Sequence, residues 1–197
     1  MRNHLNKLIV FVSGCSVMIL EIIGVRIFGA ILGTTMIVWS AIIGIFLAAL
    51  TVGYYFGGFL VRSKNKNPLI LSAILALAAA SVIMISPVKD QIGALPQFVS
   101  YELRSLLLSL GLFALPAFLL GTVTVYVIGL KAENFENFGT DNGTLYGFST
   151  IGSIAGVFLS GFYLIPNYRI SSIIFAVGIA LFAASALSLV LHRRHVN

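Results

Sequence analysis

The residues with the clearest potential for chemistry are an acid and a base inside one long apolar run. Glu21 and Arg26 lie within the segment from Ser13 to Phe28, which is otherwise almost entirely apolar. Ionisable residues are rare at membrane depth, where they pair, face the interior of a bundle or serve function. On an ideal helix they are separated by about 140°, so they do not pair along one straight helix. Each therefore needs a partner on another helix, unless Gly24 permits a local distortion.

Three interpretations of these charges follow from the sequence. They form a packing pair that fixes helix contacts, Glu21 binds a ligand or a proton, or Arg26 reaches the nearby interface with its long side chain. A carboxylate in low dielectric suits a small cation, since a charge-assisted hydrogen bond offsets part of the desolvation cost. The candidate ligand-binding residues are Glu21, Arg26, Ser13, Ser40 and Tyr146.

The composition indicates a membrane protein. Of the 197 residues, 59% are hydrophobic and 9% are charged, whereas soluble domains carry about 25% charged residues. The net charge of +6 is concentrated in short loops, a distribution that orients helices and argues against nucleic-acid binding. Cys15 is the single cysteine, which excludes an intrachain disulfide.

Apolar runs near the length needed to cross a bilayer predict an all-α protein with one domain of six transmembrane helices. The expected helices span residues 8–28, 35–61, 69–86, 102–130, 144–165 and 170–191. Pro87, Gly93 and Pro96 predict an interfacial or re-entrant segment between the third and fourth helices. Small residues let membrane helices approach closely, and the expected packing glycines are Gly14, Gly44, Gly53, Gly57, Gly152, Gly156 and Gly161.

Basic residues predict the orientation. With six helices both termini share one side, and that side carries eight basic residues: Arg2, Lys7, Arg62, Lys64, Lys66, Lys131, Arg193 and Arg194. The other side has Lys89, Arg104 and Arg169, with Arg26 near it. The positive-inside rule therefore predicts an inner (cytoplasmic) membrane protein with both termini in the cytoplasm.

Two further patterns bear on fold and chemistry. Gly33-Thr34 followed by residues 44–48 is similar to Gly143-Thr144 followed by residues 156–160. Helices two and five would then correspond in a three-plus-three inverted repeat, although the narrow alphabet makes chance an equal explanation. His192 and His195 have a spacing that suits a metal, but the two arginines between them favour a charged anchor. No catalytic residue, metal or cofactor is predicted.

Two stretches resemble a known family. Ser13-Gly14, Glu21, Arg26, Gly33-Thr34-Thr35, Trp39-Ser40, Gly53 and Gly57-Gly58 resemble the opening helices of the membrane domain in fused spermidine-synthase-like proteins. Residues 143–146, Thr150, Gly152, Gly156, Gly161-Phe162 and Pro166 resemble the glycine-rich helix late in that domain. The resemblance covers about residues 10–62 and 143–166.

The resemblance implies a domain related to half of a facilitator-type transporter, which in that family commonly precedes a soluble aminopropyltransferase domain. Because this chain ends just after its sixth helix, the catalytic domain is expected to be absent. The expected role is non-enzymatic: binding or passing a small polar or cationic molecule such as a polyamine, or serving as membrane partner of a separate synthase. Alternatives are a structural subunit of a larger membrane complex, a half-transporter that forms a homodimer, and an enzyme acting within the membrane. The expected partners are the lipid bilayer, an aminopropyltransferase-like protein or membrane complex, and a second copy, with no nucleic acid.

Overall fold

A computed structural model describes residues 2–62, 67–91, 100–131 and 138–196, and the described part is helical without strands. The long helices are α1 (Arg2–Leu32), α2 (Met36–Arg62), α3 (Pro68–Lys89), α4 (Tyr101–Lys131), α5 (Phe138–Phe158) and α7 (Ile170–Val196). A π-helical turn, η3 (Leu159–Leu164), and the short α6 (Ile165–Asn167) continue α5. The predicted all-α fold is confirmed.

Six helices in the described ranges are long and apolar enough to cross a membrane. Most exceed their predicted bounds by a few residues. The largest differences are in α1, which starts at Arg2 instead of residue 8, in α5, which starts at Phe138 instead of residue 144, and in α7, which ends at Val196 instead of residue 191. α3 continues through Pro87 to Lys89, three residues beyond its predicted end. Pro87 lies near the end of α3, where its effect on the hydrogen-bond ladder is limited. Most of the predicted interfacial segment lies outside the described residues.

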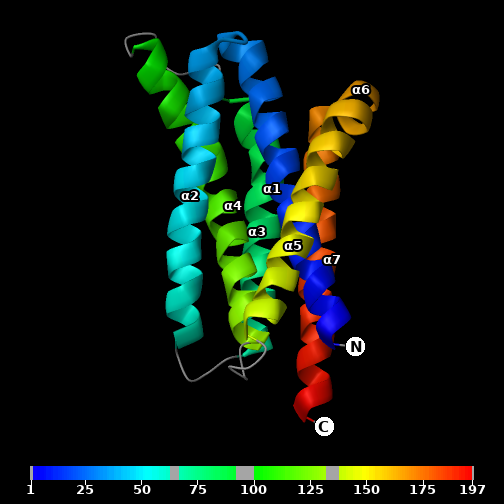
Figure 1. Cartoon of the computed structure of the whole chain (residues 1–197). Coiled ribbons are helices and arrows are strands. Elements are labelled where there is room, and N and C mark those ends of the chain that lie inside the picture. The colour runs from blue at the N-terminus through cyan, green and yellow to red at the C-terminus, as the bar shows by residue number, and fades with distance from the viewer. Residues whose placement is uncertain (1, 63–66, 92–99, 132–137, 197) are drawn as a thin grey trace.

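Both chain termini lie at the same end of the bundle (Figure 1). We call this end the terminal side and the opposite end the distal side. Successive long helices alternate in direction between them, so α1 runs toward the distal side and α4 runs away from it.

The helices pack in a pattern that repeats. α2 packs along α4 as α5 packs along α1, and α3 contacts α4 as α7 contacts α1. The remaining large contact, between α3 and α7, maps onto itself when the first three long helices exchange places with the last three. Since the two units run in opposite directions, the bundle has the arrangement of a three-plus-three inverted repeat.

Individual residues follow the same repeat. Gly53 and Gly57 of α2 lie against the backbone of α4 at Phe118 and Thr122. Gly152 and Gly156 of α5 lie against the backbone of α1 at Phe11 and Cys15. Each of these helix pairs also has a hydrogen bond that the repeat does not relate to the other: Thr122 donates to the Gly53 carbonyl (3.2 Å), and Ser153 donates to the Gly14 carbonyl (3.3 Å).

These contacts correct the register of the internal similarity. Helices two and five correspond, but the structure aligns Gly53 and Gly57 with Gly152 and Gly156, whereas the sequence comparison aligned residues 44–48 with 156–160. One constant shift in residue number relates both pairs and also relates Gly44 to Gly143 and Thr51 to Thr150. The narrow alphabet of apolar helices had concealed this alignment.

Candidate functional site

Glu21 lies on α1 between the side that faces α4 and the side that faces α5. Ser13 and Gly24 point to α4, where they meet Leu120 and Phe113. Gly14 points to α5, where it meets Ser149. Glu21 follows Gly14 by two turns and is displaced by about 80° from Ser13. The Glu21 side chain therefore leaves α1 between the directions of α4 and α5, and it is half-buried.

The depth of Glu21 places it within the apolar part of the bundle. It lies about 17 Å from the distal end of α1, inside the candidate span His4–Leu32. Within the part of the chain that the structure describes, Glu21 has no ion-pair or side-chain hydrogen-bond partner. A carboxylate in this setting requires a partner or a water-accessible groove.

Arg26 points elsewhere. Its side chain is exposed and lies about 9 Å from the distal end of α1. No acidic partner for it is found among the described residues. This placement agrees with the interpretation in which the guanidinium reaches the interface, and it does not produce a pair with Glu21.

The structure separates the other candidate residues. Ser13 is fully buried and donates a hydrogen bond to the Leu120 carbonyl (3.3 Å), so in this structure it joins α1 to α4, and its ligand role stays a prediction. Ser40 is exposed about 6 Å from the distal end of α2, and Tyr146 is exposed about 12 Å from the terminal-side end of α5. The five predicted residues therefore do not form one site.

The predicted packing glycines divide into two groups. Those that lie against a neighbouring helix are Gly14, Gly53, Gly57, Gly152 and Gly156. Gly44 and Gly161 are exposed, and a β-carbon added at either position would have no other group within 4 Å, so neither lies against another helix of the chain. Lipid and the protein interior are equally apolar, so the residues around a glycine do not show whether it faces lipid or a neighbouring helix.

The two repeats differ around Glu21. The repeat relates α1 to α4 by its own shift in residue number, which takes Gly14 to Gly121. The same shift takes Glu21 of α1 to Ile128 of α4. Ile128 is buried (8% exposed), whereas Glu21 is only half-buried. α2 and α5 converge toward the terminal side (Figure 1). They separate toward the distal side (Figure 1).

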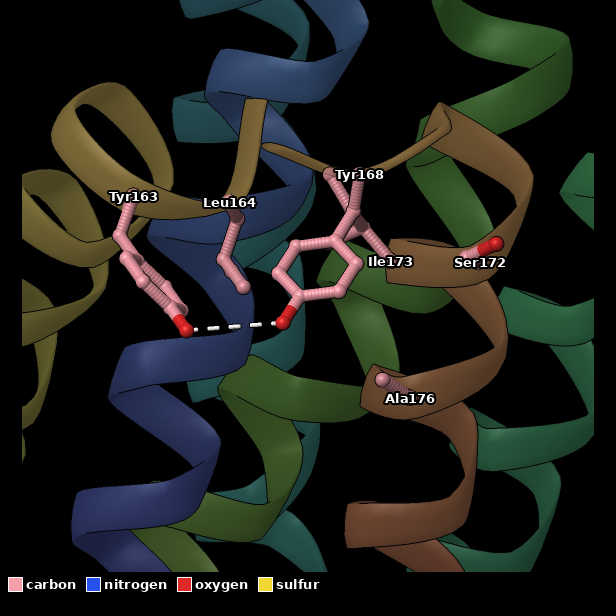
Figure 2. Close-up of a pocket in the computed structure, with 6 residues that line it drawn as sticks. All are labelled: Tyr163, Leu164, Tyr168, Ser172, Ile173 and Ala176. Atoms are coloured by element: carbon pink, nitrogen blue, oxygen red, sulfur yellow. Dashed lines mark hydrogen bonds between the residues drawn. The ribbon is translucent and has the colours of Figure 1, made fainter. Parts of the chain in front are cut away.

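A small pocket of about 170 Å³ lies at the distal side, between the π-helical turn and α7. Figure 2 shows the hydroxyls of Tyr163 and Tyr168 directed toward each other across its mouth, 3.5 Å apart. The hydrogen bond with Tyr163 raises the pKa of Tyr168 above its ordinary value. The Tyr168 phenol is therefore neutral near pH 7. The lining is otherwise mostly apolar and contains no charged group, so this pocket does not suit an ion.

Sequence reasoning missed a set of exposed polar side chains on α2 and α5. Thr51, Tyr54, Tyr55 and Thr150 all face outward at membrane depth. The available signal was the helical spacing of Gly44, Ala48 and Thr51, repeated in Gly143, Gly147 and Thr150. In the sequence alone, the same spacing indicates internal packing.

The chain is thus a multi-pass helical membrane protein with a half-buried carboxyl group at membrane depth. Comparison with protein-family models, with curated proteins and with solved structures finds no match. Among the described residues no group of three or more His, Cys, Asp or Glu side chains is placed to hold a metal ion.

Proposed function

We propose that this protein binds or passes a small cation, with Glu21 as the residue that holds it. The observation that supports the proposal is the half-buried carboxyl group of Glu21, which lies at membrane depth on the side of α1 between α4 and α5. A cation entering from the distal side meets Glu21 after crossing about half of the apolar layer.

The chemistry at Glu21 favours a cation over an anion or a neutral ligand. Glu21 is the only acidic residue between the ends of α1, and Arg26 points away from it by about 140°. A carboxylate at this depth gains charge-assisted hydrogen bonds from an ammonium group, which offset the desolvation of both ions. A proton satisfies the same carboxylate by neutralising it, and is therefore the main competitor of the cation.

The resemblance to the membrane domain of spermidine-synthase-like proteins narrows the proposal to polyamines. It extends the proposal to an inner-membrane location and to a separate soluble aminopropyltransferase-like partner, which would make or use the amine. Both extensions are proposals that depend on that resemblance.

Spermidine is the probe for a direct test. Binding of radiolabelled spermidine is measured on the purified protein in nanodiscs made of neutral lipid, so that anionic headgroups do not compete. We expect saturable binding by the wild type and a loss of at least tenfold in affinity for Glu21→Gln, which nearly retains the shape but removes the charge. Glu102→Gln is the matched control, because Glu102 is an exposed carboxylate in the first turn of α4.

The two variants distinguish a site from general attraction to negative charge. Equal loss of binding in Glu21→Gln and Glu102→Gln would contradict the proposal. So would wild-type binding that does not saturate. Failure of Glu21→Gln to fold is recognised by its thermal transition, in which case Glu21→Asp, which retains the charge, must retain binding if the proposal is correct.

A further inference from the structure

The pocket between the π-helical turn η3 and α7 has no part in the function proposed above. Its volume is about 170 Å³, and its lining residues are Tyr163, Leu164, Tyr168, Ser172, Ile173 and Ala176. The two tyrosines are half-exposed, whereas Ile173 is buried (2% exposed). The pocket therefore opens at the surface of the bundle and reaches inward to a residue of its core.

The π-helical turn that positions Tyr163 is supported by side chains on both sides. Ser160 is fully buried and donates to the carbonyls of Gly156 (2.7 Å) and Val157 (3.0 Å), where the α-helix ends. The Asn167 side chain donates to the Tyr163 carbonyl (2.7 Å). Carbonyl groups at both borders of the turn thus have side-chain donors. Such turns are rare in helices and are frequent at functional sites.

The hydroxyls of Tyr163 and Tyr168 have capacity for a further partner. They are directed toward each other and lie 3.5 Å apart (Figure 2), whereas O–H···O hydrogen bonds span about 2.5–3.0 Å. Because their mutual contact is long, an acceptor oxygen between them gains stronger hydrogen bonds than the pair makes alone. The mouth of the pocket therefore offers two hydroxyl donors to one acceptor atom.

The rest of the pocket is aliphatic. Figure 2 shows Leu164 between the two tyrosines and Ala176 beyond Tyr168 on α7. Ala176 lies about 9 Å from the start of α7, so it is deeper in the membrane than the Tyr168 loop. The hydroxyl pair therefore lies near the distal interface, and the aliphatic wall extends toward the hydrocarbon layer.

The volume of the pocket suits a single ring. An engineered apolar cavity of about 150 Å³ binds benzene, so about 170 Å³ admits a ring of that size with small substituents. A ring without oxygen would leave the tyrosine donors unused, whereas a ring carbonyl accepts from them. From the size, the aliphatic wall and the two donors, we propose that the pocket binds the ring of a membrane-soluble quinone. This inference goes beyond the cation at Glu21 and does not depend on it.

A tailed quinone tests the pocket directly. Binding of a radiolabelled, decyl-tailed benzoquinone is measured on the purified protein in nanodiscs of neutral lipid, after subtraction of binding to empty nanodiscs. We expect saturable binding at one site per chain. Ala176→Leu fills part of the pocket and should weaken binding at least tenfold. Ala180→Leu is the matched control, because it is exposed one turn further along α7, and it should leave binding unchanged.

Removing the hydroxyls tests the hydrogen bonds. Tyr163→Phe and Tyr168→Phe retain the rings and should each weaken quinone binding by about two- to tenfold. Decylbenzene, which has the ring and the tail but no carbonyl, should bind the wild type at least tenfold more weakly. Equal affinity for the two probes, or unchanged quinone binding in both phenylalanine variants, would overturn the proposal.

A phospholipid is the competing occupant, since its ester groups also carry carbonyl oxygens. Nanodiscs of ether-linked lipid lack these carbonyls, and the quinone should bind there as it does in ester-linked lipid. Saturable binding in ether-linked lipid alone would show that lipid esters fill the pocket, and would reject the quinone. A wild type without saturable binding in either lipid would reject it too, as would equal effects of Ala176→Leu and Ala180→Leu.

Discussion

The hydroxyl of Ser13 in α1 donates a hydrogen bond to the Leu120 carbonyl in α4, and these two residues occupy equivalent positions in the two repeats. The shift in residue number that relates Phe11 to Phe118 and Gly14 to Gly121 also relates Ser13 to Leu120. The contact is therefore its own counterpart when the two repeats exchange. α1 and α4 meet here at the centre, and α2 and α5 are carried on their outer sides.

Replacing Ser13 tests how closely α1 and α4 pack at this position. Ser13→Ala removes one hydrogen bond and should cost about 0.6 kcal/mol, the typical value for polar contacts between membrane helices. Ser13→Leu adds volume at a fully buried position and should cost about 1–3 kcal/mol or more. Unfolding in mixed micelles measures both. Ser40→Leu, at an exposed position, is the control, and a comparable loss there would contradict the placement of Ser13 at the centre.

Gly152 and Gly156 should be intolerant of larger side chains. A β-carbon at either position runs into the backbone of α1, at Phe11 and Cys15, and backbone cannot move aside without separating the helices. Gly152→Leu and Gly156→Leu are expected to lower the thermal transition in detergent by ten degrees or more, or to prevent expression. Gly139→Leu has open space and Phe158→Leu lies on an outward side chain (56% exposed), so both should be nearly silent.

The tyrosine at the terminal-side end of α4 holds the start of α3. The Tyr126 hydroxyl donates to the Asn67 carbonyl (3.1 Å) and accepts from the Asn67 amide (3.2 Å), while the Asn67 side chain accepts from the Leu69 amide and caps α3. Tyr126→Phe leaves two backbone groups without this partner, which should cost about 1–3 kcal/mol. Tyr55→Phe, on an exposed face, should cost much less in the same unfolding assay.

The orientation in the membrane is predicted by the loop charges and can be measured at two described positions. Arg62 ends α2 on the terminal side, and Arg169 precedes α7 on the distal side. In a chain with Cys15 replaced by Ala, Arg169→Cys should react with an impermeant maleimide added to intact cells. Arg62→Cys should react only after the cells are opened. The reverse pattern would place both termini outside the cytoplasm.

Hydropathy was sufficient to predict the helices because lipid selects long apolar runs, as in α2 and α7. It was not sufficient to predict which face of a helix is buried. Gly44 and Gly53 share α2, yet Gly53 lies against α4 and Gly44 faces outward. In a soluble helix the outward face would be polar, but here both faces are apolar. The π-helical turn after Phe158 was missed for a similar reason, because its sequence, LSGFYL, is as apolar as an α-helical span.

The candidate site was predicted only at its centre. Glu21 was identified from its charge, which needs no knowledge of neighbouring helices. Its surroundings depend on the contacts of α1 with α4 and α5, which are long-range in sequence and invisible to periodicity. Ser40 and Tyr146 were therefore grouped with Glu21 although they lie near opposite ends of the bundle.

The last prediction concerns the free energies of unfolding of Glu21 and Arg26 variants. The two side chains point about 140° apart and are offset by about 8 Å along α1, and no ion pair joins them. Groups that share no contact have nearly additive effects, whereas partners in a buried pair do not. Glu21→Gln should be neutral or stabilising, because the half-buried charge is removed and the amide retains the shape. Arg26→Gln should change stability by less than about 0.5 kcal/mol, since the side chain is exposed.

The double variant shows whether Glu21 and Arg26 affect stability independently or as a pair. We expect its free energy of unfolding, measured in mixed micelles, to equal the wild-type value plus the two single changes within about 0.5 kcal/mol. Two destabilised single variants with a restored double variant would instead show a structural pair. Measured on the same samples, spermidine binding should be lost in Glu21→Gln and in the double variant and retained in Arg26→Gln. That pattern assigns the carboxyl group to the ligand and the guanidinium to the interface.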